Sequence, residues 1–538
     1  MLANGRHWAL ALLALISGSG LASSCAKAEV QRPEGNSERL LHDELNLGPL
    51  EQLPVPDADG PPLAPLSLEV PVRAAPSRDA HELGYLRVGA RVARSERPVS
   101  LEGCPGGWYA VRPIGFVCAE GQATIDLENP VARALQVEPD RSHAMPYAYA
   151  FLRAVAPNYL RVPTKTQQFE REMSLERHLR SWSKLREEWD KLDIGANDVP
   201  LDETGLALGA RPEQPLPLDI SQRYGGPGVA NEARPWWLQG NERKIPNLSA
   251  FNAPSYADIA GRSQRHAGLA LIGSFVAKDG EFERRFAITT DARLVPADKL
   301  KADTGSTFHG GDISDVGLPV AFPVRPGASY WELKNGDLVR AGRPELRELI
   351  PLNGKIQRFG GQRMVQARNG KWLRSDDVRA AVKPTTLPWF AAKKRHWIQV
   401  SLLSQTLVLW EGATPVYATL VSTGRDGMGD PKTTLSTPTG TFRILEKHVT
   451  TTMDSQVADH EFELRDVPWV MYFQGGYALH GAYWHDDFGR ARSHGCVNLA
   501  PIDARYVFFW SSPEVPEHWH GAMAGDAFDK GTIVQIVP

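Results

Sequence analysis

A cysteine near the C-terminal end of this chain has neighbours that can activate a thiol. His494 lies two residues before Cys496 and His480 lies 16 before it, and a histidine is the usual base for a cysteine nucleophile. Gly495 lets the backbone fold tightly against whatever the sulfur attacks. The apolar residues after Cys496 predict that the thiol lies at the mouth of a helix, where backbone N–H groups favour a thiolate.

The two histidines are predicted to have different roles. His480 closes an apolar strand pattern and precedes a glycine, so we assign it as general base and acid; His494 is assigned to lining the site. The sequence alone also permits the reverse assignment. The backbone N–H groups of Gly495 and Cys496 are candidate oxyanion-hole donors. Ser493 and Asn498 are expected to orient the loop or the substrate, although Asn498 would equally serve to satisfy buried backbone groups.

The stretch from His480 to Asn498 closely resembles the signature of the L,D-transpeptidase catalytic domain (the YkuD-like domain), in which a His-Gly pair is followed by Ser-His-Gly-Cys-x-Asn. The resemblance continues upstream through 421–424 (Val-Ser-Thr-Gly) and 436–442 (Ser-Thr-Pro-Thr-Gly-Thr-Phe), in the family's order, and covers about 386–538. One departure is Ala500 before Pro501, where relatives often carry a serine N-cap, which weakens the cap slightly.

The resemblance implies roles for the spacer between His480 and Cys496, which forms a lid over the donor site in the family. Tyr483 and Trp484 are accordingly predicted to contact substrate, with plain packing as the alternative. Arg492, together with Arg490, is predicted to meet a peptide carboxylate in a bidentate pair, with a solvated charge pair as the alternative.

The implied function is a cell-wall cysteine acyltransferase with peptidoglycan stem peptides as partners. It forms a thioester with release of D-alanine and then cross-links to another stem. Alternatives with the same chemistry are an L,D-carboxypeptidase and a protein-anchoring enzyme; a non-catalytic wall-binding lipoprotein is a further hypothesis. A zinc hydrolase built on His480, His485, Asp486, His494 and Cys496 is disfavoured because no tight metal motif occurs. No metal or cofactor is predicted, and the sequence does not indicate an oligomeric state.

The N-terminal residues and the bulk composition indicate an exported protein. Arg6 followed by an apolar stretch is typical of a signal segment, and no later run reaches transmembrane length. Cys25 follows a lipobox-like sequence, which favours a lipid-anchored envelope protein, whereas Ala26-Lys27-Ala28 suits ordinary cleavage and release to the periplasm; a cytosolic apolar start is the remaining alternative. The net charge of −3 argues against nucleic-acid binding.

Cysteine usage agrees with export. Cys104 and Cys118 flank a predicted hairpin, so we expect a disulfide between them in an oxidising compartment. Two reduced core cysteines are the alternative. Cys496 is then left as the free thiol that a nucleophile must be.

We expect a multidomain, mainly β protein. The chain of 538 residues is too long for one core. A helix is predicted over 167–192 and hairpins over 107–118, 285–298 and 364–376. Three strands from 397 to 421 and a helix over 501–510 give a mostly-β catalytic domain with one short helix after the nucleophile. The predicted segments are a signal peptide (1–25), a Pro-rich linker (26–66), a small β-barrel resembling bacterial Src-homology-3-like modules (67–127), a helical and irregular region (128–264), one or two small β modules (265–383) and the catalytic domain (384–538).

Overall fold

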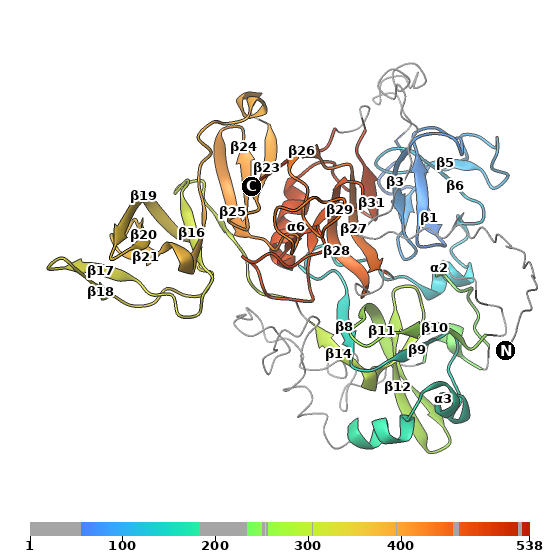
Figure 1. Ribbon diagram of the computed structural model, residues 1–538. Helices are drawn as coiled ribbons and strands as arrows, with labels where there is room; N and C mark the ends of the chain where they lie inside the picture. Colours follow the sequence, from blue (N-terminus) through green and yellow to red (C-terminus); the bar gives the residue numbers. More distant parts are fainter. Residues whose placement is uncertain are drawn as a thin grey trace, which may run out of the picture.

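The computed structural model describes residues 55–182, 234–240, 242–249, 253, 257–303, 305–393, 395–455, 462–525 and 530–538. The predicted signal segment with Cys25, most of the linker and most of the irregular stretch 197–254 lie outside these residues. The described part is mainly β, as predicted, and forms four β units (Figure 1). No helix in these ranges combines the length and apolar character needed to cross a membrane.

The C-terminal unit contains two sheets. In the first, β23, β24 and β25 form the predicted meander, and β32 joins β23 in parallel. β26 closes one edge of this sheet, and the short β15 from upstream closes the other. The bounds are β15 Gly311–Asp312, β23 His396–Ser401, β24 Thr406–Glu411, β25 Thr414–Leu420, β26 Gly440–Arg443 and β32 Ile533–Val537.

The second sheet carries the nucleophile region. β27, β28 and β29 are antiparallel neighbours, β30 runs parallel to β29, and α6 packs on β28 and β29. Side chains from both sheets and from α6 share one core that includes Leu407, Trp469 and Phe508. The bounds are β27 Glu446–Ser455, β28 Phe462–Gln474, β29 Tyr477–Gly481, β30 Val497–Leu499, α6 Pro501–Trp510 and β31 Gly521–Met523.

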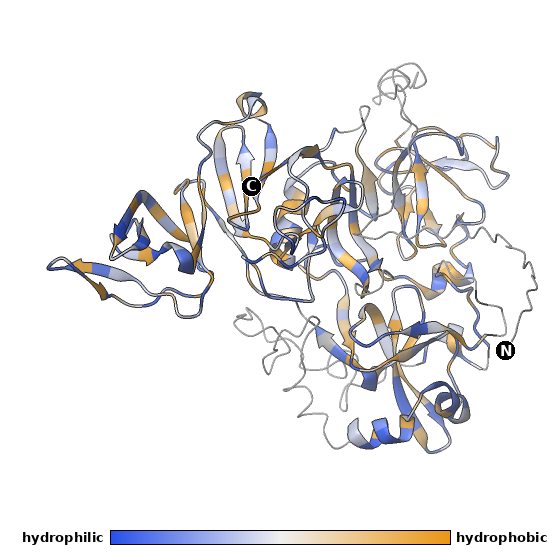
Figure 2. Ribbon diagram, in the orientation of Figure 1, coloured by the Kyte–Doolittle hydropathy of each residue, from blue (hydrophilic) through white to orange (hydrophobic). Residues whose placement is uncertain are grey.

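The predicted helix at 501–510 is confirmed, and Ala500 occupies its N-cap without a side-chain hydrogen bond. Pro501 fits the first turn because its missing N–H would have no intrahelical partner there. Apolar and polar residues are interspersed along the strands of this unit in Figure 2. β23 alternates in part, with Gln399 and Ser401 between apolar residues, whereas β24 has an unbroken apolar run from Leu407 to Trp410 that is buried on both faces. These apolar stretches, bounded by polar residues, are why the strand predictions from 397 to 421 hold.

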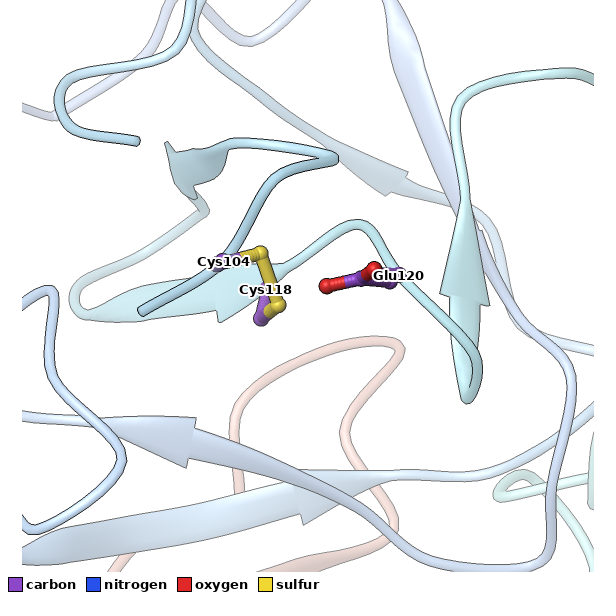
Figure 3. Close-up of side chains that lie close together, drawn as sticks. All are labelled: Cys104, Cys118 and Glu120. Carbon is purple, nitrogen blue, oxygen red and sulfur yellow. A yellow bond between two sulfur atoms is a disulfide. The ribbon is translucent and has the colours of Figure 1, made fainter. Parts of the chain in front are cut away.

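The N-terminal unit comprises seven short strands and a disulfide. Cys104 and Cys118 are bonded as predicted (Figure 3), and Trp108, Ala110 and Phe116 pack beside Cys104. The carboxylate of Glu120 lies near these sulfurs, but bonded sulfurs offer no thiolate to a metal. The bounds are β1 Pro62–Pro65, β2 Val70–Arg73, β3 Glu82–Leu86, β4 Val92–Ala93, β5 Trp108–Ala110, β6 Phe116–Cys118 and β7 Ala123–Thr124.

This unit begins earlier than the predicted boundary at residue 67. β1 falls within the predicted linker, yet Leu63 and Ala64 are fully buried between β4 and β7. β1 is the central strand of its three-stranded sheet, and its two prolines stand at its first and last positions. Proline is tolerated at the first residue of a strand, so the Pro-rich composition concealed this strand. The Src-homology-3-like assignment stays a prediction.

The next unit, which we call the middle unit, joins strands from both sides of the predicted boundary at 264. β8 pairs with β11 and β14, and β9 pairs with β10 and β13. The region 128–264 is therefore not only helical and irregular, since its first strands are completed by partners a hundred residues later. The bounds are α2 Pro130–Ala134, β8 Ala148–Leu152, β9 Ala156–Tyr159, α3 Lys165–Arg171, η3 Trp236–Leu238, β10 Ile259–Ser263, β11 Gly268–Asp279, β12 Phe282–Thr289, β13 Leu294–Pro296, η4 Ala297–Lys299 and β14 Leu300–Asp303.

The helix predicted over 167–192 is interrupted. α3 ends at Arg171, a turn with Ser174 at a φ of 58° follows, and helix resumes from 175 to 182, where the description stops. The break places the Glu172 carboxylate, itself buried, against Arg284 at 2.6 Å and Lys299 at 2.8 Å. A buried charge needs such partners, and this requirement outweighs the local helical pattern.

The fourth unit spans 320–381 and extends away from the others in Figure 1. Its hairpins include the predicted one at 364–376, which turns at Gly370 with a φ of 85°. The bounds are β16 Val320–Pro323, β17 Trp331–Lys334, β18 Asp337–Arg340, β19 Ile350–Phe359, β20 Gln362–Ala367, β21 Trp372–Arg374, η5 Ser375–Asp377 and β22 Val378–Ala381, followed by η6 Trp389–Lys393.

Three of the units meet at one buried carboxylate. Asp466 on β28 accepts hydrogen bonds from Arg87 of the N-terminal unit, Thr290 of the middle unit and Thr450 on β27. Strand pairing strengthens both joints, because β3 pairs with β31 and β11 meets β28. The N-terminal and middle units are thus fixed against the sheet that carries the nucleophile.

Candidate active site

Cys496 is buried, forms no disulfide and directly precedes β30. β30 lies in parallel register with β29, so that His480 of β29 is opposite Asn498, two residues beyond the cysteine. The thiol contacts the carbonyl oxygen of Gly476 at 3.6 Å. The strand prediction for His480 holds, but the expected helix mouth does not: the three residues of β30 and Ala500 separate Cys496 from α6.

The loop before the nucleophile is held in a tight turn by its own side chains. The Ser493 hydroxyl donates to the Cys496 carbonyl oxygen at 2.5 Å and accepts from the Gly495 N–H at 3.1 Å. Gly495 has a φ of 124°, and a Cβ there would lie 2.6 Å from the Tyr477 ring, so only glycine fits. The Gly495 N–H is engaged by Ser493 here, and the oxyanion role predicted for the N–H groups of Gly495 and Cys496 stays a prediction.

The upstream motif blocks surround this loop. The Thr423 carbonyl oxygen accepts from the N–H groups of Arg492 at 2.7 Å and Ser493 at 2.9 Å. The Thr437 hydroxyl donates to the Gly495 carbonyl oxygen at 2.7 Å and accepts from the Gly424 N–H at 2.9 Å. These segments, far apart in sequence, therefore fix the backbone of the nucleophile loop.

Both candidate histidines line the same pocket as Cys496, which has a volume of about 980 Å³. The His480 ring stacks on Trp484 with 5.5 Å between ring centres, and the His494 ring lies 5.2 Å from that of Phe462. Each histidine is thus placed at the wall of a cavity that the thiol also faces. Their division into base and site-lining residue stays a prediction.

A third histidine, His485, is buried in the wall of the same pocket. Its Nε2 contacts the side-chain amide of Asn498 at 2.9 Å, and its Nδ1 accepts from the Asp487 N–H at 3.2 Å. Burial, and after it the charges of Arg492 and other cationic groups nearby, lower the pKa of His485 to about 3. This imidazole is therefore neutral, and the Asn498 side chain supports it while the Asn498 backbone pairs with Ser422.

The spacer residues divide between pocket and core. Tyr483 does not fulfil its predicted substrate role: its ring is buried against Tyr149 at 4.5 Å and Phe151 at 5.6 Å, both from the middle unit. The packing alternative fits this residue. Trp484 and Arg492 do line the pocket, and Arg492 also pairs with Asp487 at 3.3 Å.

A buried ion pair behind the spacer was missed by the sequence analysis. Arg347 of the fourth unit donates to both carboxylate oxygens of Asp486, which also accepts from the Ser306 hydroxyl. A carboxylate engaged in this way is not available to a metal, which removes one ligand from the zinc alternative. No sequence motif near Arg347 indicates this ion pair, because its partner Asp486 lies 139 residues away.

The far wall of the pocket was also missed. It is formed by the middle unit, chiefly by 260–267 at the turn between β10 and β11, with Asn158 and Arg293. The sequence offered one weak signal, a cluster of two arginines and a histidine at 262–266 in a segment otherwise read as a domain boundary.

The C-terminal unit matches a known family. Residues 395–536 match the YkuD family, the L,D-transpeptidase catalytic domain. This range agrees with the resemblance seen at about 386–538, and it covers only the last part of the chain.

One curated relative and two solved structures that are named as L,D-transpeptidases are similar to part of this chain. "Putative L,D-transpeptidase YciB" of Bacillus subtilis (strain 168) is 25% identical over 26% of this chain and 76% of its own length. The L,D-transpeptidase of Stackebrandtia nassauensis is 27% identical over 27% of this chain and 57% of that chain, with a TM-score of 0.19. The L,D-transpeptidase of Xylanimonas cellulosilytica is 20% identical over 29% and 64%, with a TM-score of 0.19. This chain thus spans less than two thirds of those solved chains.

Proposed function

We propose that this protein is a cell-wall L,D-transpeptidase that uses Cys496 as nucleophile. The observation that carries the proposal is that His480 on β29 and Cys496, directly before the parallel neighbour β30, line one pocket inside the segment that matches the catalytic domain. The substrate is a peptidoglycan stem peptide with an L-to-D amide bond before a terminal D-alanine.

The reaction proceeds in two acyl transfers. His480 takes the Cys496 proton, and the sulfur attacks the amide carbonyl carbon to form a tetrahedral intermediate. When the C–N bond breaks, His480 returns the proton to the leaving nitrogen, and D-alanine departs from a thioester. An amine of a second stem then attacks the thioester, gives its proton to His480, and releases the thiol as the new amide forms.

The intermediate oxygen needs hydrogen-bond donors within the pocket. The N–H groups of Cys496 and Gly495 are our candidates, and we assign His494 to polarising the same carbonyl. Ser493 acts indirectly, because its bonds to Cys496 and Gly495 hold the turn that presents the sulfur.

The acceptor defines the alternatives. Water as acceptor makes the protein a carboxypeptidase, and a protein lysine makes it an anchoring enzyme. Export to the periplasm or cell envelope, with or without a lipid on Cys25, belongs to the same proposal because stem peptides lie outside the cytoplasm. A non-catalytic wall-binding lipoprotein is the competing hypothesis from another class.

Intact-mass measurement after incubation with a carbapenem separates the enzyme from the binding protein. The natural chain is expected to gain one covalent adduct, and a Cys496→Ala variant none, while both retain the same circular dichroism spectrum. An unmodified natural chain would refute the nucleophile. A muropeptide profile of cells with and without the protein then identifies the acceptor.

A further inference from the structure

The pocket around Cys496 has a wall that the matched catalytic segment does not supply. Residues 260–267, Asn158 and Arg293 belong to the middle unit, whereas the match begins at 395. At about 980 Å³ the cavity is at the upper end of ordinary small-molecule sites, and it accommodates several peptide residues.

The wall is fixed in place by buried contacts. The Ser263 hydroxyl donates to the Glu463 carboxylate at 3.0 Å and accepts from the Asn158 amide at 3.1 Å. Gly268 pairs with Leu464, and a Cβ on Gly268 would lie within 3.0 Å of the buried Tyr483 ring. The wall and the nucleophile therefore keep one relative position.

The turn in this wall has a strained backbone. His266 has a φ of 70°, and its N–H donates to the Leu152 carbonyl oxygen at 2.8 Å. A non-glycine residue in this conformation persists only where its surroundings impose it, and such residues cluster at ligand sites. Here the conformation places Arg265, the preceding residue, at the pocket.

The pocket is cationic. Its lining holds five arginines against two carboxyl groups, namely Arg262, Arg265, Arg293, Arg465, Arg492, Asp454 and Glu463. Three of the arginines have carboxylate partners: Asp291 for Arg293, Glu463 for Arg465 and Asp487 for Arg492. Arg262 donates to the Arg171 carbonyl oxygen.

Arg265 is exposed, as Arg262 is, and neither makes an ion pair with a residue in the described ranges. Arg265 differs from all four others in that its side chain also makes no hydrogen bond to a described residue. A planar guanidinium of this kind matches a carboxylate in a bidentate pair. Arg265 is therefore available to pair with an anionic group of a ligand in this pocket.

We propose that Arg265 of the middle unit binds a carboxylate of the donor peptide whose amide reacts at Cys496. The inference rests on the proposed function and adds to it a specificity-determining residue outside the catalytic segment. An acidic peptide is then selected over its amidated form by a unit that has no part in the chemistry.

Equilibrium binding by Cys496→Ala protein, which cannot react, tests Arg265 without turnover. The probe is a synthetic tetrapeptide that ends in an L-to-D bond before D-alanine, offered with free carboxylates or with these amidated. Adding Arg265→Gln is expected to weaken binding of the acidic peptide about 10-fold or more, the scale of one charge-assisted hydrogen-bonded pair. The amidated peptide should bind equally with and without the substitution, and Arg265→Lys should keep part of the acidic preference.

Arg358 supplies the matched control. It is an exposed arginine on β19, far from the pocket lining, so Arg358→Gln changes net charge equally and should leave both affinities unchanged. The inference is overturned if Arg265→Gln binds both peptides as its parent does, if Arg358→Gln has the same effect, or if the Cys496→Ala protein does not bind the acidic peptide.

Turnover with Cys496 intact separates this inference from the proposed function. Arg265→Gln is expected to raise KM for the acidic peptide about 10-fold while kcat is kept. A natural chain that binds the acidic peptide through Arg265 but releases no D-alanine refutes the transpeptidase proposal and supports the binding role.

Discussion

Lowering the pH from about 7.5 to about 5 is expected to reduce the free energy of unfolding of the C-terminal unit by about 2 kcal/mol more in the natural chain than in a His485→Gln variant. His485 is 3% exposed, and its pKa falls from 6.5 to about 3 through burial and neighbouring cations. The folded chain therefore keeps this ring neutral throughout the range. The unfolded chain protonates it below about pH 6.5.

The unfolded chain carries the extra proton, and stability falls as the pH is lowered wherever the unfolded state binds more protons than the folded state. Each pH unit below about 6.5 costs about 1.36 kcal/mol, so the interval of about 1.5 units down to pH 5 amounts to about 2 kcal/mol. The variant lacks this group and loses only what the remaining groups contribute.

Asp303 provides a control of opposite sign. Burial raises its pKa to about 7, so the folded chain keeps it protonated where the unfolded chain has already ionised it. Its contribution to stability is present at low pH and is lost as the pH rises towards 7. An Asp303→Asn variant should therefore lose more unfolding free energy on acidification than the natural chain does. Because the two groups act in opposite directions, only the difference in pH dependence between each variant and the natural chain is informative.

Hydrogen exchange measures these differences unit by unit in a multidomain chain, with amides of β14 reporting on Asp303 in the middle unit. Opening free energies for amides of β29 and β30, corrected for intrinsic exchange at each pH, report the sheet that surrounds His485. A difference in opening free energy between the natural chain and His485→Gln that is the same at every pH reflects the lost contact with Asn498. If the difference does not change with pH anywhere in the range, the neutral, buried imidazole is refuted.

The remaining predictions concern catalysis and the disulfide. His480→Gln is expected to lower the acylation rate by at least about 10²-fold, the scale of a positioned acid–base group, and His494→Gln by less; the reverse order in stopped-flow acylation would exchange their roles. D-Alanine release should persist in EDTA and stop with iodoacetamide, whereas loss on chelation that zinc restores would favour a metal enzyme. Reduction of Cys104–Cys118, which closes a separation of 14 residues, should cost the N-terminal unit about 3 kcal/mol in thermal unfolding and leave the acylation rate unchanged; a mixed bridge to Cys496 in non-reducing peptide maps would contradict this.

The sequence predicted correctly those elements that are determined by residues close together in the chain. The alternation at 397–402 gives β23, the Asn-Gly pair gives the turn of the β20–β21 hairpin, and Pro501 marks the start of α6. In each case the residue pattern and the backbone requirement lie within a few positions of each other. The disulfide was predictable for the same reason, because one hairpin brings its two cysteines together.

Long-range partners explain what sequence patterns missed. The predicted helix breaks because Glu172 must reach Arg284, more than a hundred residues away, and β8 finds its partners only at β11 and β14. Nothing in the sequence shows that the Gly495 N–H bonds to the Ser493 hydroxyl. The burial of Tyr483 was missed for the same reason, because its packing partners, Tyr149 and Phe151, belong to a different unit.

The position of Asp466 argues that the pocket depends on more than the catalytic segment. Its carboxylate is 2% exposed and is satisfied by donors from three units, of which Arg87 alone carries a charge. Removing a unit would strip donors from a buried anion, at a cost on the scale of several kcal/mol. The junction therefore opposes separation of the middle unit from β28, and with it any drift of Arg265 away from Cys496. The proposed reaction centre at His480 and Cys496 and the proposed recognition site on the β10–β11 turn can then be changed independently by substitution, while the Asp466 junction keeps their relative position.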